Sequence, residues 1–133
     1  MFSKKKDEKN APKPHLLTEL EQLCENDKET YEALLPVMFL DPRKIETTAK
    51  QAADNAKRLE KDQDFVRARM WYEVAGGLSL YEGNAKKVAE YYGSAEEITG
   101  AKYLILKNPE KTTAKAREFY SKYLTDAAGA ART

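Results

Sequence analysis

The sequence predicts an all-α protein, built as an antiparallel helical bundle or a short, irregular α-solenoid of six to seven helices. Apolar residues recur at spacings of three and four in each long segment, which places them on one face of a helix. Strand-forming residues never gather into an alternating run. The composition is 34% charged and 41% hydrophobic and is rich in Ala, Glu, Lys and Leu, which is typical of amphipathic helices.

The length of 133 residues is that of one domain. We predict a single helical domain over residues 15–126, with a flexible basic tail at 1–14 before it and a flexible tail at 127–133 after it. The first tail holds five lysines and two acidic residues, a net charge of +3, whereas the remaining residues hold 18 basic and 20 acidic side chains. The folded part is therefore not basic, and we expect the lysine tail to be solvated.

The first helix is expected within residues 15–26, where four leucines and Cys24 follow helical spacing. Asp27 together with Thr30 either starts a second helix or prolongs the first one. Pro36 ends or kinks whichever helix precedes it.

Asp41 before Pro42 predicts the start of a helix that runs to about Lys61, because a carboxylate caps exposed amides and proline is tolerated in a first turn. The apolar face of this helix is narrow and consists mostly of alanine, at Ile45, Ala49, Ala52, Ala56 and Leu59. Such a stripe permits the close approach of a neighbouring helix.

Asp62 and Asp64 precede an expected helix over 65–82, and Gly83 is its expected C-terminal residue. The last third of the chain is expected to hold three helices, at 85–92, 95–107 and 109–126. Gly93 separates the first two, and the sequence SAEE at 94–97 is predicted to form a capping box. Asn108 and Pro109 repeat the start signal for the third.

Three segments share a pattern in which a small residue stands four places before the second member of an aromatic doublet. The doublets are Trp71-Tyr72, Tyr91-Tyr92 and Phe119-Tyr120. Because the small residue and the second aromatic lie on one helix face and the first aromatic covers another, each helix is expected to pack between two neighbours.

These segments, over about residues 68–124, resemble the tetratricopeptide repeat family. The best matching unit starts at Trp71-x-x-Val74-Ala75-x-x-Leu78, turns at Gly83-Asn84, and ends with Val88, Tyr92 and Ala95. The copies lie 20 and 28 residues apart, whereas the family has a constant repeat of 34. The resemblance implies a scaffold that binds an extended peptide or another protein in a concave groove.

Two adjacent glycines stand near the middle of the helix expected at 65–82. On a helical wheel, Gly76 shares a face with small residues, so we expect it to permit close packing against the alanine stripe. Gly77 lies on a different face, near Arg69, Glu73 and Leu80. It is either a tolerated glycine on a solvated face or a point where a third element of the chain or a partner's backbone approaches.

The second interpretation predicts a partner-binding site at Arg69, Glu73, Gly77 and Leu80. A second candidate patch, Val37, Met38 and Phe39, is expected instead to be buried where the chain crosses between helices.

Residues for catalysis or for binding a cofactor are not apparent. His15 is the single histidine and Cys24 the single cysteine, so one chain assembles neither a disulfide nor a Cys/His zinc site. His15 borders the predicted tail, which disfavours a nucleophile–histidine arrangement, and no phosphate-binding glycine loop is present. We therefore expect no catalytic residue, no metal and no cofactor, and hence no enzyme.

These observations favour a non-catalytic protein-interaction or assembly module that binds a protein, a peptide or a second copy of the chain. We expect it in the cytoplasm and not in a membrane, because the longest apolar run, LLPVMFL at 34–40, is too short to span a bilayer. The alternative is a nucleic-acid- or ribosome-associated accessory factor that uses the basic tail. Nucleic acid is the less favoured partner, because the tyrosines follow core spacing and are not interleaved with a basic stripe.

Overall fold

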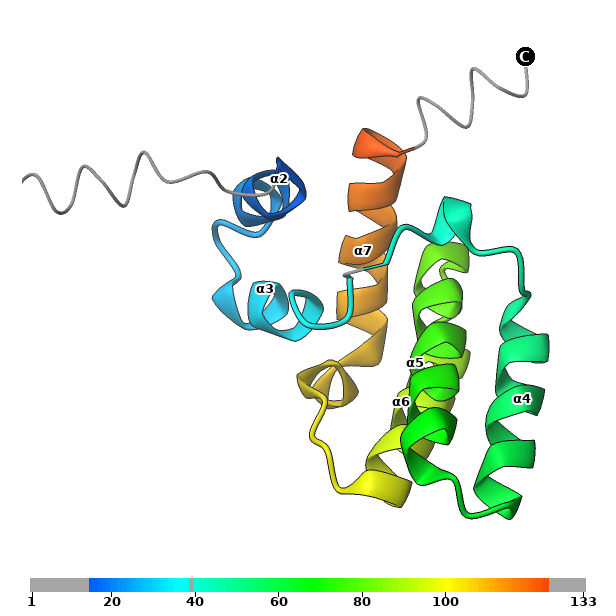
Figure 1. Cartoon of the computed structure of the whole chain (residues 1–133). Coiled ribbons are helices and arrows are strands. Elements are labelled where there is room, and N and C mark those ends of the chain that lie inside the picture. Colours follow the sequence, from blue (N-terminus) through cyan, green and yellow to red (C-terminus); the bar gives the residue numbers. More distant parts are fainter. Residues whose placement is uncertain (1–14, 39, 125–133) are drawn as a thin grey trace, which may run out of the picture.

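The structure is a computed structural model that describes residues 15–38 and 40–124, with side chains from residue 19 onward. These residues form six α-helices, two short 3₁₀ helices and no strand, which confirms the predicted all-α class (Figure 1). The tails predicted at 1–14 and 127–133 lie outside the described residues.

The elements follow one another along the chain as α2 (His15–Leu23), α3 (Lys28–Leu34), η1 (Pro42–Lys44), α4 (Ala49–Lys61), α5 (Phe65–Glu82), α6 (Ala85–Thr99), η2 (Leu104–Lys107) and α7 (Pro109–Tyr123). Helices α4, α5 and α6 run alternately up and down, with α5 packed between α4 and α6. Helix α7 packs against α5 and α6, and α3 packs against α7 and η2 (Figure 1). Helix α5 is thus the central element.

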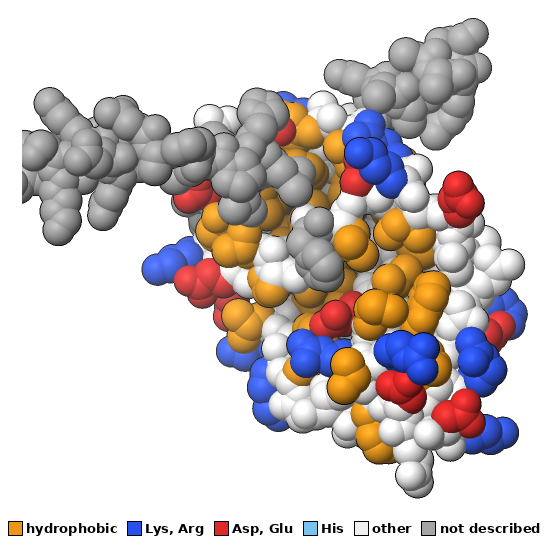
Figure 2. Space-filling view, viewed as in Figure 1, with side chains coloured by type: hydrophobic (Ala, Val, Ile, Leu, Met, Phe, Trp, Pro, Cys, Tyr) orange, Lys and Arg blue, Asp and Glu red, His pale blue; other side chains and the backbone are white. Residues whose placement is uncertain are grey.

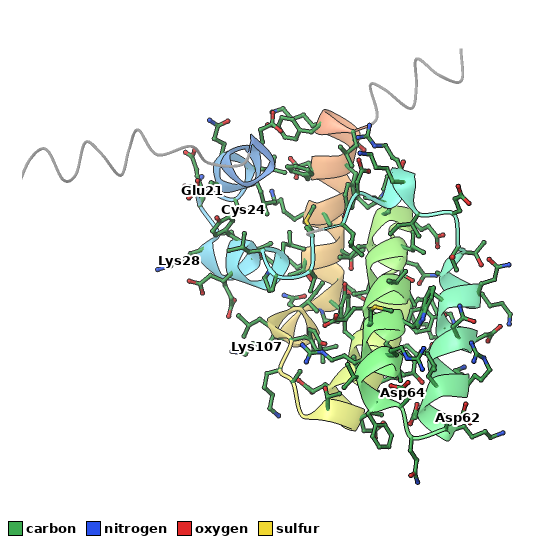
Figure 3. All side chains as sticks on the ribbon, viewed as in Figure 1. Glu21, Cys24, Lys28, Asp62, Asp64 and Lys107 are labelled. Atoms are coloured by element: carbon green, nitrogen blue, oxygen red, sulfur yellow. The ribbon has the colours of Figure 1, made fainter. Side chains whose placement is uncertain are left out.

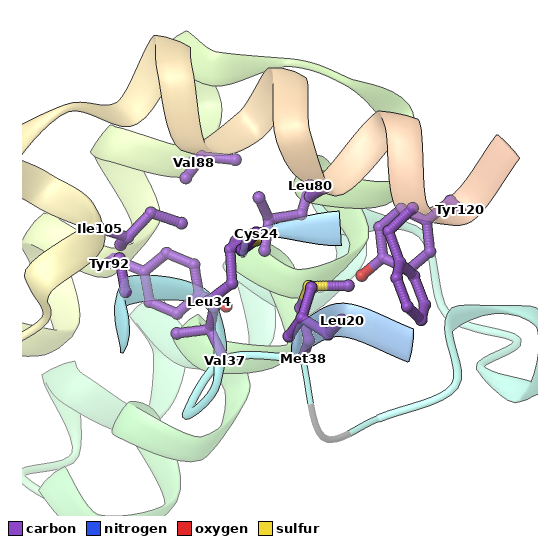
Figure 4. Packing of buried hydrophobic residues seen from close by; sticks show 13 residues of the cluster. Leu20, Cys24, Leu34, Val37, Met38, Leu80, Val88, Tyr92, Ile105 and Tyr120 are labelled. Carbon is purple, nitrogen blue, oxygen red and sulfur yellow. The ribbon is translucent and has the colours of Figure 1, made fainter. Parts of the chain in front are cut away.

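Two apolar clusters hold these helices together. The larger one joins α2 and α3 to the C-terminal end of α5 and to α6, η2 and α7, and its largest fully buried side chains include Tyr92, Phe119, Leu20, Leu34 and Leu80 (Figure 4). The smaller one lies between α4, α5 and α6 and combines the α4 alanines with Tyr72, Ala75, Leu78, Tyr91 and Ala95.

The aromatic doublets are buried as expected. Tyr72, Tyr91, Tyr92, Phe119 and Tyr120 are each at most 5% exposed, and Trp71 is half-buried. The small residues of the same pattern, among them Ala68, Val88 and Ala116, are fully buried. The pattern therefore marks the helix faces that pack against neighbours.

Helix α4 begins later than predicted. Asp41 and Pro42 open a single 3₁₀ turn, η1, after which Ile45 is extended, with φ −97° and ψ 119°. The α-helix starts at Thr48, whose Oγ1 accepts a hydrogen bond from the Gln51 N–H at 3.1 Å while Gln51 Oε1 accepts one from the Thr48 N–H at 3.1 Å. This capping box satisfies two amides at once and was readable in the sequence as TAKQ.

Helix α6 is continuous, so the predicted break at Gly93 and the predicted helix over 95–107 are wrong. The SAEE segment lies inside α6, and the helix ends at Gly100, which has the left-handed φ of 78°. Tyr91, Tyr92 and Ala95 flank the glycine and are all buried, and an unbroken helix keeps them on packed faces. The packing outweighs the cost of about 1 kcal/mol for a helical glycine.

Gly76 does pack closely, but its neighbour is not the one predicted. A Cβ placed on Gly76 would lie 2.5 Å from Cε2 of Tyr92, so the glycine accommodates a ring from α6. The alanines of α4 face other residues of α5. The link between α4 and α5 is completed by Tyr72, whose hydroxyl donates to Glu60 Oε1 at 2.7 Å.

Helix α3 begins separately from α2, which settles the alternative that the sequence left open at Asp27. Asp27 Oδ1 accepts a hydrogen bond from the Thr30 N–H at 3.1 Å, and Asp27 Oδ2 accepts one from Thr30 Oγ1 at 2.7 Å. Lys111 Nζ of α7 lies 2.8 Å from the same Oδ2. One carboxylate therefore caps α3 and ties it to α7.

The Asp27 contacts predict a pH dependence. The Lys111 hydrogen bond, followed by those from Thr30, lowers the pKa of Asp27 to about 2, below the value of about 3.9 expected in the unfolded chain. Its stabilising contribution is therefore present above about pH 4 and is lost as the pH falls through the range between these values. We expect the melting temperature of the native protein to exceed that of Asp27→Asn at neutral pH, with the difference vanishing near pH 2. A difference that grows on acidification would contradict this account.

Candidate partner-binding surface

The four residues predicted to bind a partner all lie on α5, but they do not share one surface. Leu80 is 0% exposed and belongs to the larger core cluster, which corrects its assignment as a contact residue. Arg69, Glu73 and Gly77 are half-buried. The wheel placed Leu80 near Gly77 correctly but did not show that α5 is covered on that side.

Arg69 and Glu73 form a closed network with Tyr103, which lies just before η2. The Tyr103 hydroxyl donates to Glu73 Oε2 at 2.5 Å, while Arg69 Nε donates to the Tyr103 hydroxyl at 3.1 Å and to Glu73 Oε2 at 3.2 Å. The Tyr103 ring also packs against Tyr92, with centroids 5.2 Å apart. The network fastens the segment after α6 to α5.

The pKa shifts within this network favour the protonation states that keep its hydrogen bonds intact. Burial, together with the hydrogen bond to Glu73, raises the pKa of Tyr103 to about 12, so its hydroxyl stays protonated at neutral pH. The hydrogen bond with Tyr103 raises the pKa of Arg69. Arg69 compensates the Glu73 charge, and the site presents a neutral ion pair to its surroundings.

Gly77 leaves room for a side-chain atom beside this network. A Cβ placed on Gly77 would lie 3.9 Å from the Tyr92 hydroxyl oxygen, an ordinary van der Waals contact. The glycine is therefore not required by packing within the chain, in contrast to Gly76. A Cβ would fit above its backbone without a clash.

The sequence analysis missed the most exposed apolar residues of α5. Val66 is 80% exposed and Met70 is 47% exposed. At helical spacing they continue into a row of uncharged residues whose other members are half-buried. Two of these, Val74 and Tyr81, pack against the edges of the core clusters. We call this row the α5 stripe: Val66, Met70, Val74, Gly77 and Tyr81.

The α5 stripe differs from the outward face of the neighbouring helix. The exposed residues of α4 include Lys50, Asp54, Lys57, Arg58 and Lys61, as expected for a solvated surface. The signal that could have revealed the stripe is that α5 carries apolar residues on every side, which is typical of a helix covered all round. Among the helices of the described residues, none covers the side of α5 that carries Val66 and Met70.

The space-filling view shows hydrophobic side chains gathered on the face where α5 lies in front, with acidic and basic side chains around them (Figure 2). Asp62 and Asp64 lie at the turn between α4 and α5, at the N-terminal end of the stripe, and Lys107 lies on η2 to the other side (Figure 3). Asp64 Oδ2 accepts a hydrogen bond from Arg67 Nε at 2.6 Å. Charged residues therefore border the stripe, and the Arg69–Glu73 pair lies directly beside it on α5.

Other features give little sign of a reactive site. The hollow between α3, η2 and α7 has a volume of about 10 Å³, far smaller than the roughly 300 to 1,000 Å³ of small-molecule pockets. Burial raises the pKa of the Cys24 thiol, which disfavours the nucleophilic thiolate. Within residues 15–38 and 40–124, no three His, Cys, Asp or Glu side chains come together as a metal site would require, and no helix has the length and apolar character of a membrane span.

The chain matches no protein-family model, no curated protein and no solved structure. The resemblance to tetratricopeptide repeats stays a prediction from the residues that carry it.

Proposed function

We propose that the protein is a non-catalytic interaction module that binds an α-helical segment of a protein partner along the α5 stripe. The observation that carries this proposal is the exposure of Val66 and Met70 on the central helix, in a row without charged residues. Covering such a row removes apolar surface from water, which stabilises a complex by about 25 cal/mol per Å² of apolar area.

A helix is the partner element that fits this surface best. The side chains of the stripe stand three or four residues apart, and such rows form the ridges that pack against the grooves of another helix. Gly77 interrupts the row with a position that lacks a side chain, which lets a partner's side chain approach the helix backbone. Recognition of one helix by another in this way uses anchors at the same three- and four-residue spacing.

The stripe spans about 20 Å, or four turns of helix. That length suits a partner helix of ordinary size better than a small molecule. The tetratricopeptide-like features of the sequence support the same class of function. The alternative of a nucleic-acid- or ribosome-associated factor rests on residues 1–14, outside the described part of the chain, and stays a prediction.

The proposal is tested by placing a photo-crosslinking amino acid at position 70 in cells that express the protein. Position 57, on the charged face of α4, is the matched control because Lys57 is also exposed and helical. We expect the amino acid at position 70 to crosslink the chain to a protein partner and the one at position 57 to give no such crosslink. Equal yields at both positions, or none at position 70, would rule out the stripe as the binding surface.

A further inference from the structure

We propose that Arg69 is the polar anchor of the α5 stripe, and that its two terminal amino groups bind a carboxylate on the partner helix. This inference rests on the proposed function, because it names the chemistry of the partner that binds the same surface. The expected partner is a helix that carries an Asp or Glu about one turn from the apolar side chain that covers Met70.

Arg69 is held in place through the Nε side of its guanidinium. Nε donates to Glu73 Oε2 at 3.2 Å and to the Tyr103 hydroxyl at 3.1 Å, and Cζ lies 5.9 Å from the centroid of the Tyr103 ring. The Tyr103 ring in turn packs against the buried Tyr92. These contacts orient the guanidinium before a partner binds, which lowers the entropic cost of binding.

The opposite edge of the guanidinium is open to a partner. Nη1 and Nη2 of Arg69 have no hydrogen-bond or ion-pair partner among residues 15–38 and 40–124, and the side chain is 43% exposed. Two such amino groups form a pair of parallel hydrogen bonds with a carboxylate, which is among the strongest polar contacts in proteins. Arg67 lacks this property, because its Nε and Nη2 both bind Asp64 Oδ2.

The charge of Glu73 leaves this edge open. Glu73 is bound by the Tyr103 hydroxyl and by Arg69 Nε, and Nε points away from the edge formed by Nη1 and Nη2. The network therefore uses one of the five N–H donors of the guanidinium. Because Glu73 compensates the Arg69 charge, its replacement by the isosteric glutamine is expected to strengthen the binding of a carboxylate.

Arg69 lies next to the most exposed part of the stripe. It is adjacent to Met70 in the chain and follows Val66 by three residues, so a helix that covers these two side chains passes within reach of the guanidinium. Apolar contacts alone discriminate poorly between partner helices. A helix without an acceptor at this place would leave the donors of Arg69 covered and unpaired, which penalises the wrong partner.

The photo-crosslinking amino acid at position 70 also tests this inference. We expect Arg69→Gln to lower the yield of the partner crosslink at least about threefold and Glu73→Gln to raise it. Tyr103→Phe is the matched control, because it removes a contact of the same network and leaves Nη1 and Nη2 in place. Arg58→Gln on α4 controls for the loss of one positive charge. We expect neither control to change the yield, and circular dichroism checks that each variant remains helical.

Mass spectrometry of the crosslinked product identifies the partner segment. A peptide copy of this segment is compared with a variant in which the expected carboxylate is replaced by its amide, so that this protein itself stays unaltered. We expect the amide peptide to bind the native protein about five- to tenfold more weakly than the acidic peptide. We expect Arg69→Gln to bind the two peptides equally, as a direct contact between the two groups requires.

The possible failures are distinguishable. If position 70 gives no crosslink, the proposed function and this inference fail together. If it does crosslink to a partner, but the segment has no acidic residue within about one turn or the two peptides bind the native protein equally, Arg69 is not the anchor and the interaction module stands. If Tyr103→Phe lowers the yield as much as Arg69→Gln, Arg69 acts only by fastening the network, and the inference is overturned.

Discussion

Replacing Phe119 with alanine is expected to lower the free energy of unfolding by about 3 to 5 kcal/mol, the usual cost of removing a large aromatic side chain from a core. Phe119 is 0% exposed, and its ring lies 4.8 Å from the ring of Tyr123 and 6.1 Å from that of Tyr120, between centroids. It belongs to the larger cluster, which joins α2 and α3 to the rest of the molecule. The loss would be a large fraction of the total stability of a protein of this size.

Urea unfolding followed by circular dichroism measures this loss. Phe65→Ala is the matched control, because Phe65 is 43% exposed and its truncation removes few contacts. If Phe119→Ala does not fold, Phe119→Leu supplies a smaller cavity and an intermediate loss. Equal effects at positions 119 and 65 would mean that the larger cluster does not carry the stability assigned to it.

The two adjacent glycines of α5 are expected to respond to alanine in opposite directions. At Gly76 the new Cβ would lie 2.5 to 2.8 Å from three ring atoms of Tyr92, which is 1% exposed and has no room to move. We expect Gly76→Ala to destabilise the protein by about 1 to 3 kcal/mol, more than alanine gains in helix propensity. At Gly77 the new Cβ fits, so Gly77→Ala is expected to stabilise the protein by about 0.5 to 1 kcal/mol.

Both glycine variants are best compared with the native chain at one low protein concentration, because association of any kind changes the measured stability. The difference between neighbouring positions is informative because the local helix and the substitution are the same. Stabilisation by both substitutions would show that Tyr92 moves aside readily, and the assigned role of Gly76 would be wrong.

Several local features could be predicted because their causes are local. Asp64 and Asn108 cap α5 and α7 as expected, since each side chain accepts a hydrogen bond from an amide three residues later. Gly83 ends α5 in the left-handed conformation that glycine tolerates best. The buried faces followed from the aromatic doublets.

The candidate surface could be predicted only in part. Gly77 was identified from the cost of a glycine in a helix, and Arg69 and Glu73 from their place on the wheel. Leu80 was wrongly included, and Val66 and Met70 were overlooked. Whether an apolar residue of a helix that is apolar on all sides is exposed depends on which neighbours cover it, and periodicity carries no such information.

The sequence alone determined the all-α class, both ends of α5, the starts of α6 and α7 and the small-plus-aromatic faces, because hydrogen bonds and side-chain spacing within one helix decide them. The tertiary structure decided that α6 continues through Gly93, that Gly76 meets Tyr92 of α6, and that one side of α5 faces solvent. The physical reason is that these outcomes depend on contacts between residues far apart in the chain. The free energy of such contacts exceeds the roughly 1 kcal/mol differences in local preference on which the sequence prediction rested.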